Sequence, residues 1–539
     1  MQGLMQDYPL TLPHIFHRAE KLFSESRIAT ATHSGIERIT YGEWAGRTRR
    51  LGGALDILEV SDSGRVGTFA WNTGRHLELY FAVPCSERVL HTLNIRLFPE
   101  QVAYIVNHAE DEVIFVDRSL VALLWPMADD LKTVHHFVIM DDGKGDVPDD
   151  PRIVAYEDLL SEAQPIDFHV EDERRAAAMC YTSGTTGNPK GVVYSHRSTF
   201  LHSLGINTAD SLAISETDVL MPIVPMFHAN AWGTPYAGVF AGADFVMPGP
   251  DLSPGAILNL LEGERVTISA GVPTIWMALV PLLEGRDLSS IRTITSGGSA
   301  VPKALSETFR EKIGLPLFQG WGMTETSPLG SLAWVKSTLA GRSEDELIEI
   351  RAKQGLTLPC VDARIVDVDT GREVAWDGRN FGELQVRGPW IASAYYKDDS
   401  GEQKFTSDGW LRTGDVATMD GDGYIHLVDR TKDVIKSGGE WVSSVDLENE
   451  IMAHPRVAEA AVIGVPHPKW QERPLACVVV RKGEELTKND VIDFLIPRVA
   501  KWWVPDDVVF VEEIPKTSVG KFSKKDLRAR FSDYRLPSA

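Results

Sequence analysis

The sequence predicts an α/β protein in which doubly wound layers are followed by a β-rich subdomain and then by a small α+β segment. Short runs of β-branched residues alternate with helical patterns through the first 170 residues and again from 219 to 294, which is the rhythm of layered α/β domains. From about 361 to 428 the pattern changes to short strands separated by glycine and aspartate turns. At roughly 150 residues per domain, the 539 residues allow three or four compact units.

The first layer is predicted from a capping signal and from apolar runs. Thr40 and Glu43 form a capping box, which predicts a helix that begins directly after Thr40. Residues 66–71 are predicted to form a strand, residues 101–108 a helix and residues 113–117 the next strand. Strand, helix and strand in this order are the unit of a parallel sheet.

The later regions show the same rhythm and then a change of pattern. Strands are predicted at residues 219–224, 243–247, 363–368, 383–386 and 424–428. The last three belong to the β-rich subdomain. After Asp429-Arg-Thr-Lys432 a small α+β segment begins, so we place a domain boundary there.

Composition excludes several classes of protein. The chain is 43% hydrophobic and 24% charged, and it has no apolar run approaching the ~18 residues that span a bilayer. Its N-terminus lacks the basic stretch and apolar core of a signal peptide. Four scattered cysteines, with no C-x-x-C spacing, argue against a disulfide framework or a zinc site. A net charge of −22 argues against nucleic-acid or anionic-membrane binding. We therefore expect a cytoplasmic enzyme.

The run Tyr181-Thr-Ser-Gly-Thr-Thr-Gly-Asn-Pro-Lys-Gly191 carries the strongest chemical signal. Its glycines allow bare N–H groups to approach an anion, and its hydroxyl groups add donors for phosphate oxygens. Apolar strands are predicted on both sides, at 176–181 and 192–194. The spacing does not match a P-loop. A nucleotide triphosphate site is predicted, and a plain surface loop is the alternative.

Six further motifs follow this loop in a fixed order. They are Pro225-Met-Phe-His-Ala-Asn-Ala-Trp-Gly233, Ser296-Gly-Gly-Ser-Ala-Val-Pro302, Gln319-Gly-Trp-Gly-Met-Thr-Glu-Thr326, Gly409-Trp-Leu-Arg-Thr-Gly-Asp415, Asp429-Arg-Thr-Lys-Asp-Val-Ile-Lys-Ser-Gly-Gly-Glu440 and Pro515-Lys-Thr-Ser-Val-Gly-Lys521. Together the seven resemble the adenylate-forming superfamily, which contains acyl-CoA synthetases, peptide-synthetase adenylation domains and beetle luciferases. The resemblance implies an N-terminal AMP- and acyl-binding domain at 1–429, a hinge at 430–432 and a mobile C-terminal domain at 433–539.

The resemblance implies ATP, Mg²⁺ and coenzyme A as cofactors and cosubstrates, with a carboxylic acid as the substrate. Joining a carboxylate to AMP requires positive charge and donors where negative charge builds. Glu325 would hold Mg²⁺, with Thr324 beside it on the phosphate. Lys521 would bridge the substrate carboxylate and the α-phosphate. The residues expected to bind ATP or AMP are Thr182, Ser183, Gly184, Thr185, Thr186, Gly187, Lys190, Gly298, Ser299, Gln319, Gly320, Trp321, Gly322, Met323, Thr324, Asp415 and Arg430.

The acid substrate is predicted from the second motif. Amino-acid adenylating relatives carry an aspartate right after the aromatic residue, whereas Phe227 is followed here by His228. His228 would be a mobile gate of the acyl channel, and a core histidine is the alternative. The expected pocket walls are His228, Asn230, Trp232, Val272, Trp276, Gly298 and Trp321. Three indoles around one pocket favour a short acid, although each could equally be a core aromatic residue.

The C-terminal segment is expected to serve the thiol step. Lys432 matches the hinge position, and the residues expected near coenzyme A are Lys436, Gly438, Gly439, Glu440 and Trp441. Lys436 could equally be an exposed side chain.

Within the superfamily the sequence resembles the short- and medium-chain branch, most closely the 3-methylmercaptopropionate-CoA ligases of dimethylsulfoniopropionate (DMSP) degradation. The resemblance implies an acyl-CoA ligase, expected to be a homodimer. A medium-chain fatty-acid ligase, an oxidative adenylase of the luciferase kind and a noncatalytic acyl-adenylate binder are the alternatives; the binder would be expected to lack Glu325 or Lys521, and both are present. Ser86-Glu-Arg88 stands where such sequences carry small residues with a glycine, so altered local packing is expected there.

Overall fold

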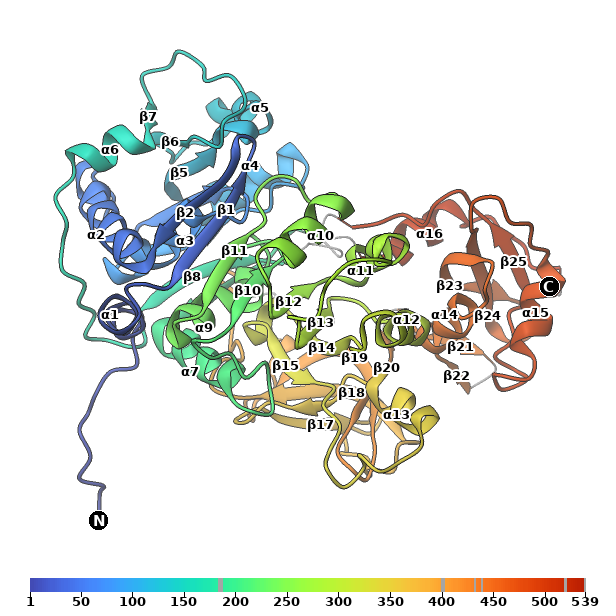
Figure 1. Cartoon of the computed structure of the whole chain (residues 1–539). Coiled ribbons are helices and arrows are strands. Elements are labelled where there is room, and N and C mark those ends of the chain that lie inside the picture. Colours follow the sequence, from blue (N-terminus) through green and yellow to red (C-terminus); the bar gives the residue numbers. More distant parts are fainter. Residues whose placement is uncertain (183–187, 399–402, 431–432, 438–439, 518–520, 538–539) are drawn as a thin grey trace.

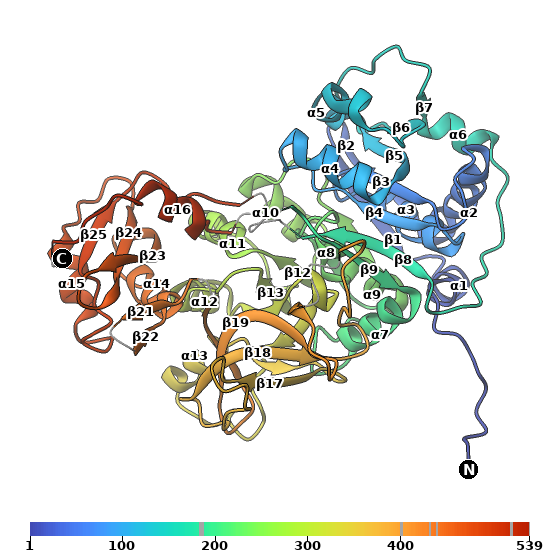
Figure 2. The same cartoon turned by 180° about the vertical axis from the view of Figure 1, so that it is seen from behind.

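The computed structural model describes the chain except for residues 183–187, 399–402, 431–432, 438–439, 518–520 and 538–539. The described residues form four sheets (Figure 1). The elements from α1 to α6 lie at one end of the molecule, and those from β21 to α16 lie at the other end in both views (Figures 1 and 2).

A seven-stranded sheet contains most of the first layer. Its strands run in the order β7-β6-β5-β3-β4-β8-β9 and are all parallel except for the antiparallel pair β8 and β9. Their bounds are β3 (Arg65–Phe69), β4 (Val89–Thr92), β5 (Asp111–Asp117), β6 (His136–Met140), β7 (Ile153–Ala155), β8 (Ala176–Tyr181) and β9 (Gly191–Ser195). The β8–β9 pair brackets the glycine-rich loop, as the sequence predicts.

A nine-stranded sheet lies beside the first one, in the order β16-β15-β14-β13-β12-β10-β11-β1-β2. Its central strands are parallel and its two edges are antiparallel. The bounds are β1 (Arg27–Thr32), β2 (Gly35–Thr40), β10 (Val219–Pro222), β11 (Asp244–Met247), β12 (Ile268–Gly271), β13 (Thr293–Gly297), β14 (Phe318–Gly322), β15 (Leu329–Leu332) and β16 (Leu356–Thr357).

Helices of the N-terminal region join the two sheets. Side chains of α1 (Leu12–Leu22), α2 (Tyr41–Ile57), α3 (Gly74–Cys85), α7 (His196–Asn207) and α9 (Thr234–Ala241) share one buried cluster with strands of both sheets. A second cluster forms around α10 (Pro254–Gly263), α11 (Pro273–Leu279) and α12 (Lys303–Ile313). The remaining helices of this region include α4 (Pro99–Ala109), α6 (Tyr156–Glu162), α8 (Ala229–Trp232) and α13 (Glu344–Arg351).

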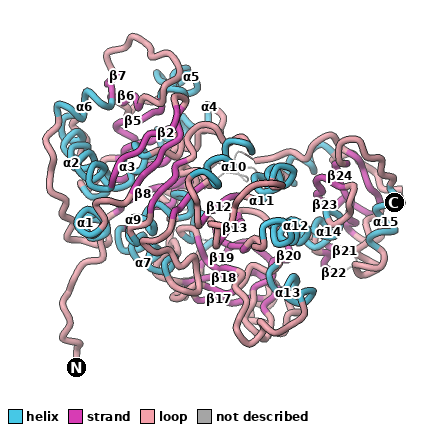
Figure 3. The backbone as a smooth tube through the Cα atoms, in the orientation of Figure 1, coloured by secondary structure: helices cyan, strands magenta, loops and turns pink. Residues whose placement is uncertain are grey.

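Two smaller sheets complete the chain. The β-rich subdomain is an antiparallel sheet of β17 (Asp362–Val366), β18 (Phe381–Arg387), β19 (Leu411–Met419) and β20 (Ile425–Arg430). The separate C-terminal domain mixes helices and strands (Figure 3). It consists of β21 (Ile435–Ser437), β22 (Glu440–Val442), β23 (Val457–His467), β24 (Gln471–Val480), β25 (Asp507–Phe510), α14 (Ser444–Met452), α15 (Lys488–Leu495) and α16 (Lys524–Arg530).

The predicted fold class is confirmed, with small shifts of the boundaries. The capping box at Thr40 is formed, and its side chain accepts from the Glu43 amide. The predicted helix at 101–108 is α4, one to two residues longer at each end. No described helix is long and apolar enough to cross a membrane.

The unusual Ser86-Glu-Arg88 segment follows α3 and is accommodated by polar contacts. Ser86 Oγ donates to the Ala82 carbonyl at 2.7 Å, and Arg88 Nη2 lies 2.6 Å from Asp56 Oδ1. Glu87 has a φ of 63°. That left-handed conformation favours glycine, so it is the backbone at Glu87 that departs most from what an L-residue prefers.

Candidate active site

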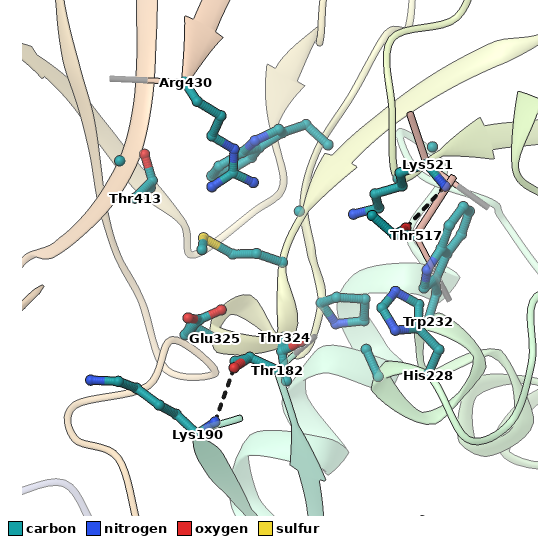
Figure 4. Close-up of a pocket in the computed structure, with 18 of the residues that line it drawn as sticks. Thr182, Lys190, His228, Trp232, Thr324, Glu325, Thr413, Arg430, Thr517 and Lys521 are labelled. Carbon is teal, nitrogen blue, oxygen red and sulfur yellow. Dashed lines mark hydrogen bonds between the residues drawn. The ribbon is translucent and has the colours of Figure 1, made fainter. Parts of the chain in front are cut away.

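A cleft lies where the carboxyl ends of β13 and β14 face the C-terminal domain. It consists of two adjoining cavities of about 570 and about 270 Å³, which share Gly298, Trp321, Arg430 and Lys521. Figure 4 shows side chains that line the larger one. Ligand crevices of open α/β sheets form outside the carboxyl ends of strands. Gly298, just beyond β13, has a φ of 82° and turns the chain away at this point.

One side of the larger cavity contains the ends of the glycine-rich loop. The Thr182 amide donates to the Lys190 carbonyl at 2.9 Å, and the Lys190 amide donates to Thr182 Oγ1 at 3.1 Å (Figure 4). These two hydrogen bonds hold the two ends of the loop together. The predicted phosphate-binding residues Ser183, Gly184, Thr185, Thr186 and Gly187 lie outside the described residues. Lys190 Nζ lies 2.7 Å from Asp398 Oδ2.

Glu325 faces the same cavity from the short turn Thr324–Thr326 and is 6% exposed. Tyr395 Oη donates to Glu325 Oε1 at 2.6 Å, and the Lys190 ammonium lies 4.9 Å from the centre of the Tyr395 ring. Burial and the Glu325 charge raise the pKa of Tyr395 above its ordinary value. The described residues contain no group of three or more metal ligands. One carboxylate beside the ends of the predicted phosphate loop nevertheless fits Mg²⁺, which takes one or two carboxylates together with substrate phosphates.

The smaller cavity is lined by polar groups, among them several residues predicted to bind the nucleotide. Asp415 on β19 is 3% exposed. Its two oxygens accept from Trp321 Nε1 at 2.9 Å and pair with Arg430 Nε at 2.7 Å. Ser299, Gln319 and Gly320 also line this cavity. The Gln319 amide has a structural task as well, because its Oε1 accepts from the Val301 amide at 2.7 Å.

Lys521 reaches into the cleft from the C-terminal domain. Its amide donates to Thr517 Oγ1 at 3.2 Å (Figure 4), and its carbonyl accepts from the Thr517 amide at 2.7 Å. Its Cε lies 3.3 Å from the place that a Cβ on Gly298 would occupy, so Gly298 leaves room for the lysine. Desolvation, with the Arg430 charge added, lowers the pKa of Lys521 to about 8.

His228 and Trp232 lie beside Lys521 in the larger cavity, as predicted (Figure 4). Desolvation lowers the pKa of His228 to about 3, and the charges of Lys521 and Arg96 act in the same direction. The imidazole is therefore neutral at physiological pH. This part of the cavity is lined by the Trp232 indole, the neutral His228 imidazole and the backbone of Gly297 and Gly298.

Three predicted pocket walls lie elsewhere. Trp276 is fully buried in the cluster around α10 to α12, where its Nε1 donates to the Gly271 carbonyl at 3.1 Å. Asn230 points into the protein and accepts from Cys180 Sγ at 2.8 Å. Val272 Cγ1 lies 3.5 Å from the place that a Cβ on Gly298 would occupy. None of the three lines either cavity. Core packing holds the Trp276 side chain away from the cleft, and hydrogen bonding holds that of Asn230.

Of the residues predicted to meet coenzyme A, the structure describes only some. Lys436 is exposed on β21 and lines neither cavity. Glu440 and Trp441 belong to β22, which pairs with β21. Gly438, Gly439 and the hinge residue Lys432 lie outside the described residues. Among the described residues of this domain, Lys521 lines both cavities and Lys436 lines neither.

Tyr395 and Asp398 were not predicted from the sequence. Both belong to the segment 388–398, whose backbone joins two parts of the site. The Ala392 amide donates to the Glu325 carbonyl at 2.8 Å, and the Tyr396 amide donates to the Gly191 carbonyl at 2.9 Å. The sequence signal was a tyrosine pair before Lys397 and Asp398, which matches no motif for phosphate binding.

Comparisons with known proteins agree with this geometry. The family model described as AMP-binding enzyme matches residues 19–396. The model described as AMP-binding enzyme C-terminal domain matches residues 446–521.

Similar proteins cover nearly the whole chain. A long-chain-fatty-acid–CoA ligase of Thermus thermophilus is 48% identical and covers 98% of this chain and 97% of its own. A 3-methylmercaptopropionyl-CoA ligase of Ruegeria lacuscaerulensis is 44% identical and covers 99% of both chains. Among solved structures, ATP-bound MatB from Rhodopseudomonas palustris has a TM-score of 0.83 at 28% identity, covering 97% of this chain and 99% of its own.

Proposed function

Because the chain belongs to the family of AMP-binding enzymes and is an AMP-forming acyl-CoA ligase, we propose that it joins 3-methylmercaptopropionate, or a similar short- to medium-chain acid, to coenzyme A. The observation that carries the proposal is the Trp232 indole beside neutral His228, next to Lys521 in the larger cavity. An apolar tail fits such walls. A charged amine placed against them would be buried without a partner, which is costly.

In the adenylation step the cleft would orient two anions toward each other. Thr182 and Lys190 would hold the outer phosphates, and Asp415, Arg430 and Trp321 would hold the ribose and adenine. Mg²⁺, when held by Glu325, would supply positive charge to the phosphate oxygens. The Lys521 ammonium would stabilise the charge that builds as a carboxylate oxygen attacks the α-phosphorus and pyrophosphate leaves.

The thioester step would require the C-terminal domain to turn. The same domain now presents Lys521, while Lys436 on β21 lies outside both cavities. One rigid face cannot offer both sets to one cleft. Rotation about Lys432 would exchange them, and the bare backbone of Gly438 and Gly439 would leave room for pantetheine.

The names of the relatives leave the chain length of the acid open. One relative is named for long-chain acids, two for 3-methylmercaptopropionate and one, 40% identical, for medium-chain acids. The short-pocket reading is supported by the position of the Trp232 ring, whose Cη2 lies 3.1 Å from the place of a Cβ on Gly297. A medium-chain ligase of general metabolism is the second candidate.

The test is CoA-dependent AMP release across straight-chain acids of two to sixteen carbons together with 3-methylmercaptopropionate. We expect the highest kcat/KM for 3-methylmercaptopropionate and for acids of four to six carbons, since each buried methylene is worth about 0.8 kcal/mol only while the tail fits. Amino acids should be inert. Trp232→Ala should shift the preference to longer tails. A higher kcat/KM for palmitate than for butyrate would show that the short-pocket proposal is wrong.

A further inference from the structure

The chain carries a left-handed turn directly beside the cleft. Ala229, Asn230, Ala231, Trp232 and Gly233 have φ angles of 43°, 51°, 49°, 57° and 73°. Residues other than glycine are disfavoured in this left-handed region because their Cβ approaches the following carbonyl oxygen. Where they do adopt it, they usually occur singly. Backbone strain of this kind persists only where surrounding structure enforces it, and it concentrates at functional sites.

Buried contacts from the neighbouring sheet hold the turn in place. Asn230 Oδ1 accepts from Cys180 Sγ at 2.8 Å and from Thr92 Oγ1 at 3.4 Å. Cys180 and Thr92 lie on β8 and β4, which are parallel neighbours. All three residues are at most 3% exposed. Asparagine is also one of the few residues that tolerate the left-handed region, so both its backbone and its side chain suit this position.

The turn is locked at its far end as well. Gly233 faces the His202 ring, and a Cβ there would lie 2.5 Å from His202 Nδ1. Thr234 Oγ1 donates to the Ala231 carbonyl at 2.7 Å. Neither end of the turn can therefore slide along the chain without a clash or a lost hydrogen bond.

The turn carries Trp232 and directly follows His228, the two rings beside Lys521 in the larger cavity. His228 precedes it, and its carbonyl accepts from the Ala231 amide at 3.1 Å. Trp232 is its fourth residue and faces Gly297. Figure 4 shows the two rings next to each other and beside Lys521. A right-handed turn at the same place would send these side chains in other directions, so the handedness of the turn decides where the cavity wall lies.

We propose that Asn230, Cys180 and Thr92 are positioning residues that set acid specificity by holding the left-handed turn, although none of them lines the cavity. The inference rests on the proposed ligase function. It predicts that loss of the buried hydrogen bonds changes which acids are used while leaving the nucleotide site intact. Glu325 and Asp415 belong to other elements, and Thr182, which directly follows β8, is held by its own bonds to Lys190.

The test compares acid profiles and ATP kinetics of four variants. Asn230→Ala, Cys180→Ala and Thr92→Val each remove one partner, whereas Cys180→Ser keeps a donor. We expect the first three to raise KM for the best acid about tenfold, the scale of a lost buried hydrogen bond, and to narrow the spread of kcat/KM among acids of four to ten carbons to about twofold. KM for ATP should change less than twofold, and Cys180→Ser should keep the parental profile. Cys477→Ala is the matched control, because Cys477 is buried in the C-terminal domain.

The two proposals fail in different ways. The parental acid profile alone decides the proposed substrate class, whereas the inference is judged by how the variants change that profile, whichever acid is best. Unchanged profiles in Cys180→Ala and Thr92→Val would overturn the inference. Equal increases in KM for acid and for ATP would also overturn it, because they would indicate a general loss of structure. Should Asn230→Ala fail to fold, the Cys180→Ala and Cys180→Ser pair decides.

Discussion

The protonation of Lys521 offers the sharpest test of the adenylation step. Its pKa is lowered from an ordinary 10.5 to about 8 by desolvation and by the Arg430 charge. A shift of this size corresponds to at most about 3 kcal/mol, at 1.36 kcal/mol per pH unit. Because the pKa is lower in the folded chain than in the unfolded chain, the ammonium costs folding stability below pH 8. That cost is relieved as the pH rises from about 8 to about 10.5.

Adenylation should show the opposite trend with pH, because it needs the charged form. The pH profile of kcat/KM reports groups of the free enzyme, so kcat/KM for ATP should fall about tenfold per unit above pH 8. The profile of kcat should break at a higher pH, since bound phosphates favour the ammonium. Pyrophosphate exchange measures this half-reaction. Lys521→Arg, which stays charged throughout this range, should remove the break.

Lys521→Ala separates the two half-reactions. Loss of one preorganised charge should slow adenylation by about 10²–10³-fold and abolish the break. Thioester formation from pre-made acyl-AMP should be unaffected. A parental profile that stays flat to pH 9.5, or an equal loss in both half-reactions, would refute the assigned role of Lys521.

Three further outcomes are expected from contacts elsewhere in the chain. Tyr395→Phe removes the donor to Glu325 Oε1 and should raise KM for ATP by about tenfold without changing KM for the acid; steady-state kinetics with each substrate varied would test this. Trp276→Ala should lower the free energy of unfolding in urea by about 3–5 kcal/mol and leave the acid preference unchanged. A shift in the acid preference would show that Trp276 does line the acyl pocket. Arg528→Gln removes the contact between α16 and Asp433; it should slow pyrophosphate exchange several-fold but not the thioester step, and equal slowing would argue against a role in holding Lys521.

Much of the fold follows from local signals in the sequence. The capping box at Thr40 and the apolar run of β5 mark their elements because hydrogen bonding and burial act within a few residues. Strand β19 was not predicted, because residues 409–415 were identified only as a motif. Its Gly414 has a φ of 74°, and a register shift follows Val416, so the alternation that marks a strand is interrupted.

The candidate site was predictable where its residues belong to motifs. Lys521, Asp415 and Glu325 come together in one cleft as their motifs indicate. Tyr395 contacts Glu325 across 70 positions of sequence, and no local pattern can reveal such a pair. Trp276 was misplaced because its direction depends on core packing around Gly271.

The ion pair between Lys190 and Asp398 has a consequence for how tightly phosphates are held. The Lys190 ammonium already lies 2.7 Å from a carboxylate oxygen, so its charge is compensated before any nucleotide binds. If Lys190 binds the phosphates as proposed, an arriving triphosphate would exchange counter-ions, and its affinity would reflect the difference between two ion pairs and not the full strength of one. After bond cleavage the exchange can run backwards. Asp398 would then compete with pyrophosphate for the same ammonium, which would favour departure of the product over its retention.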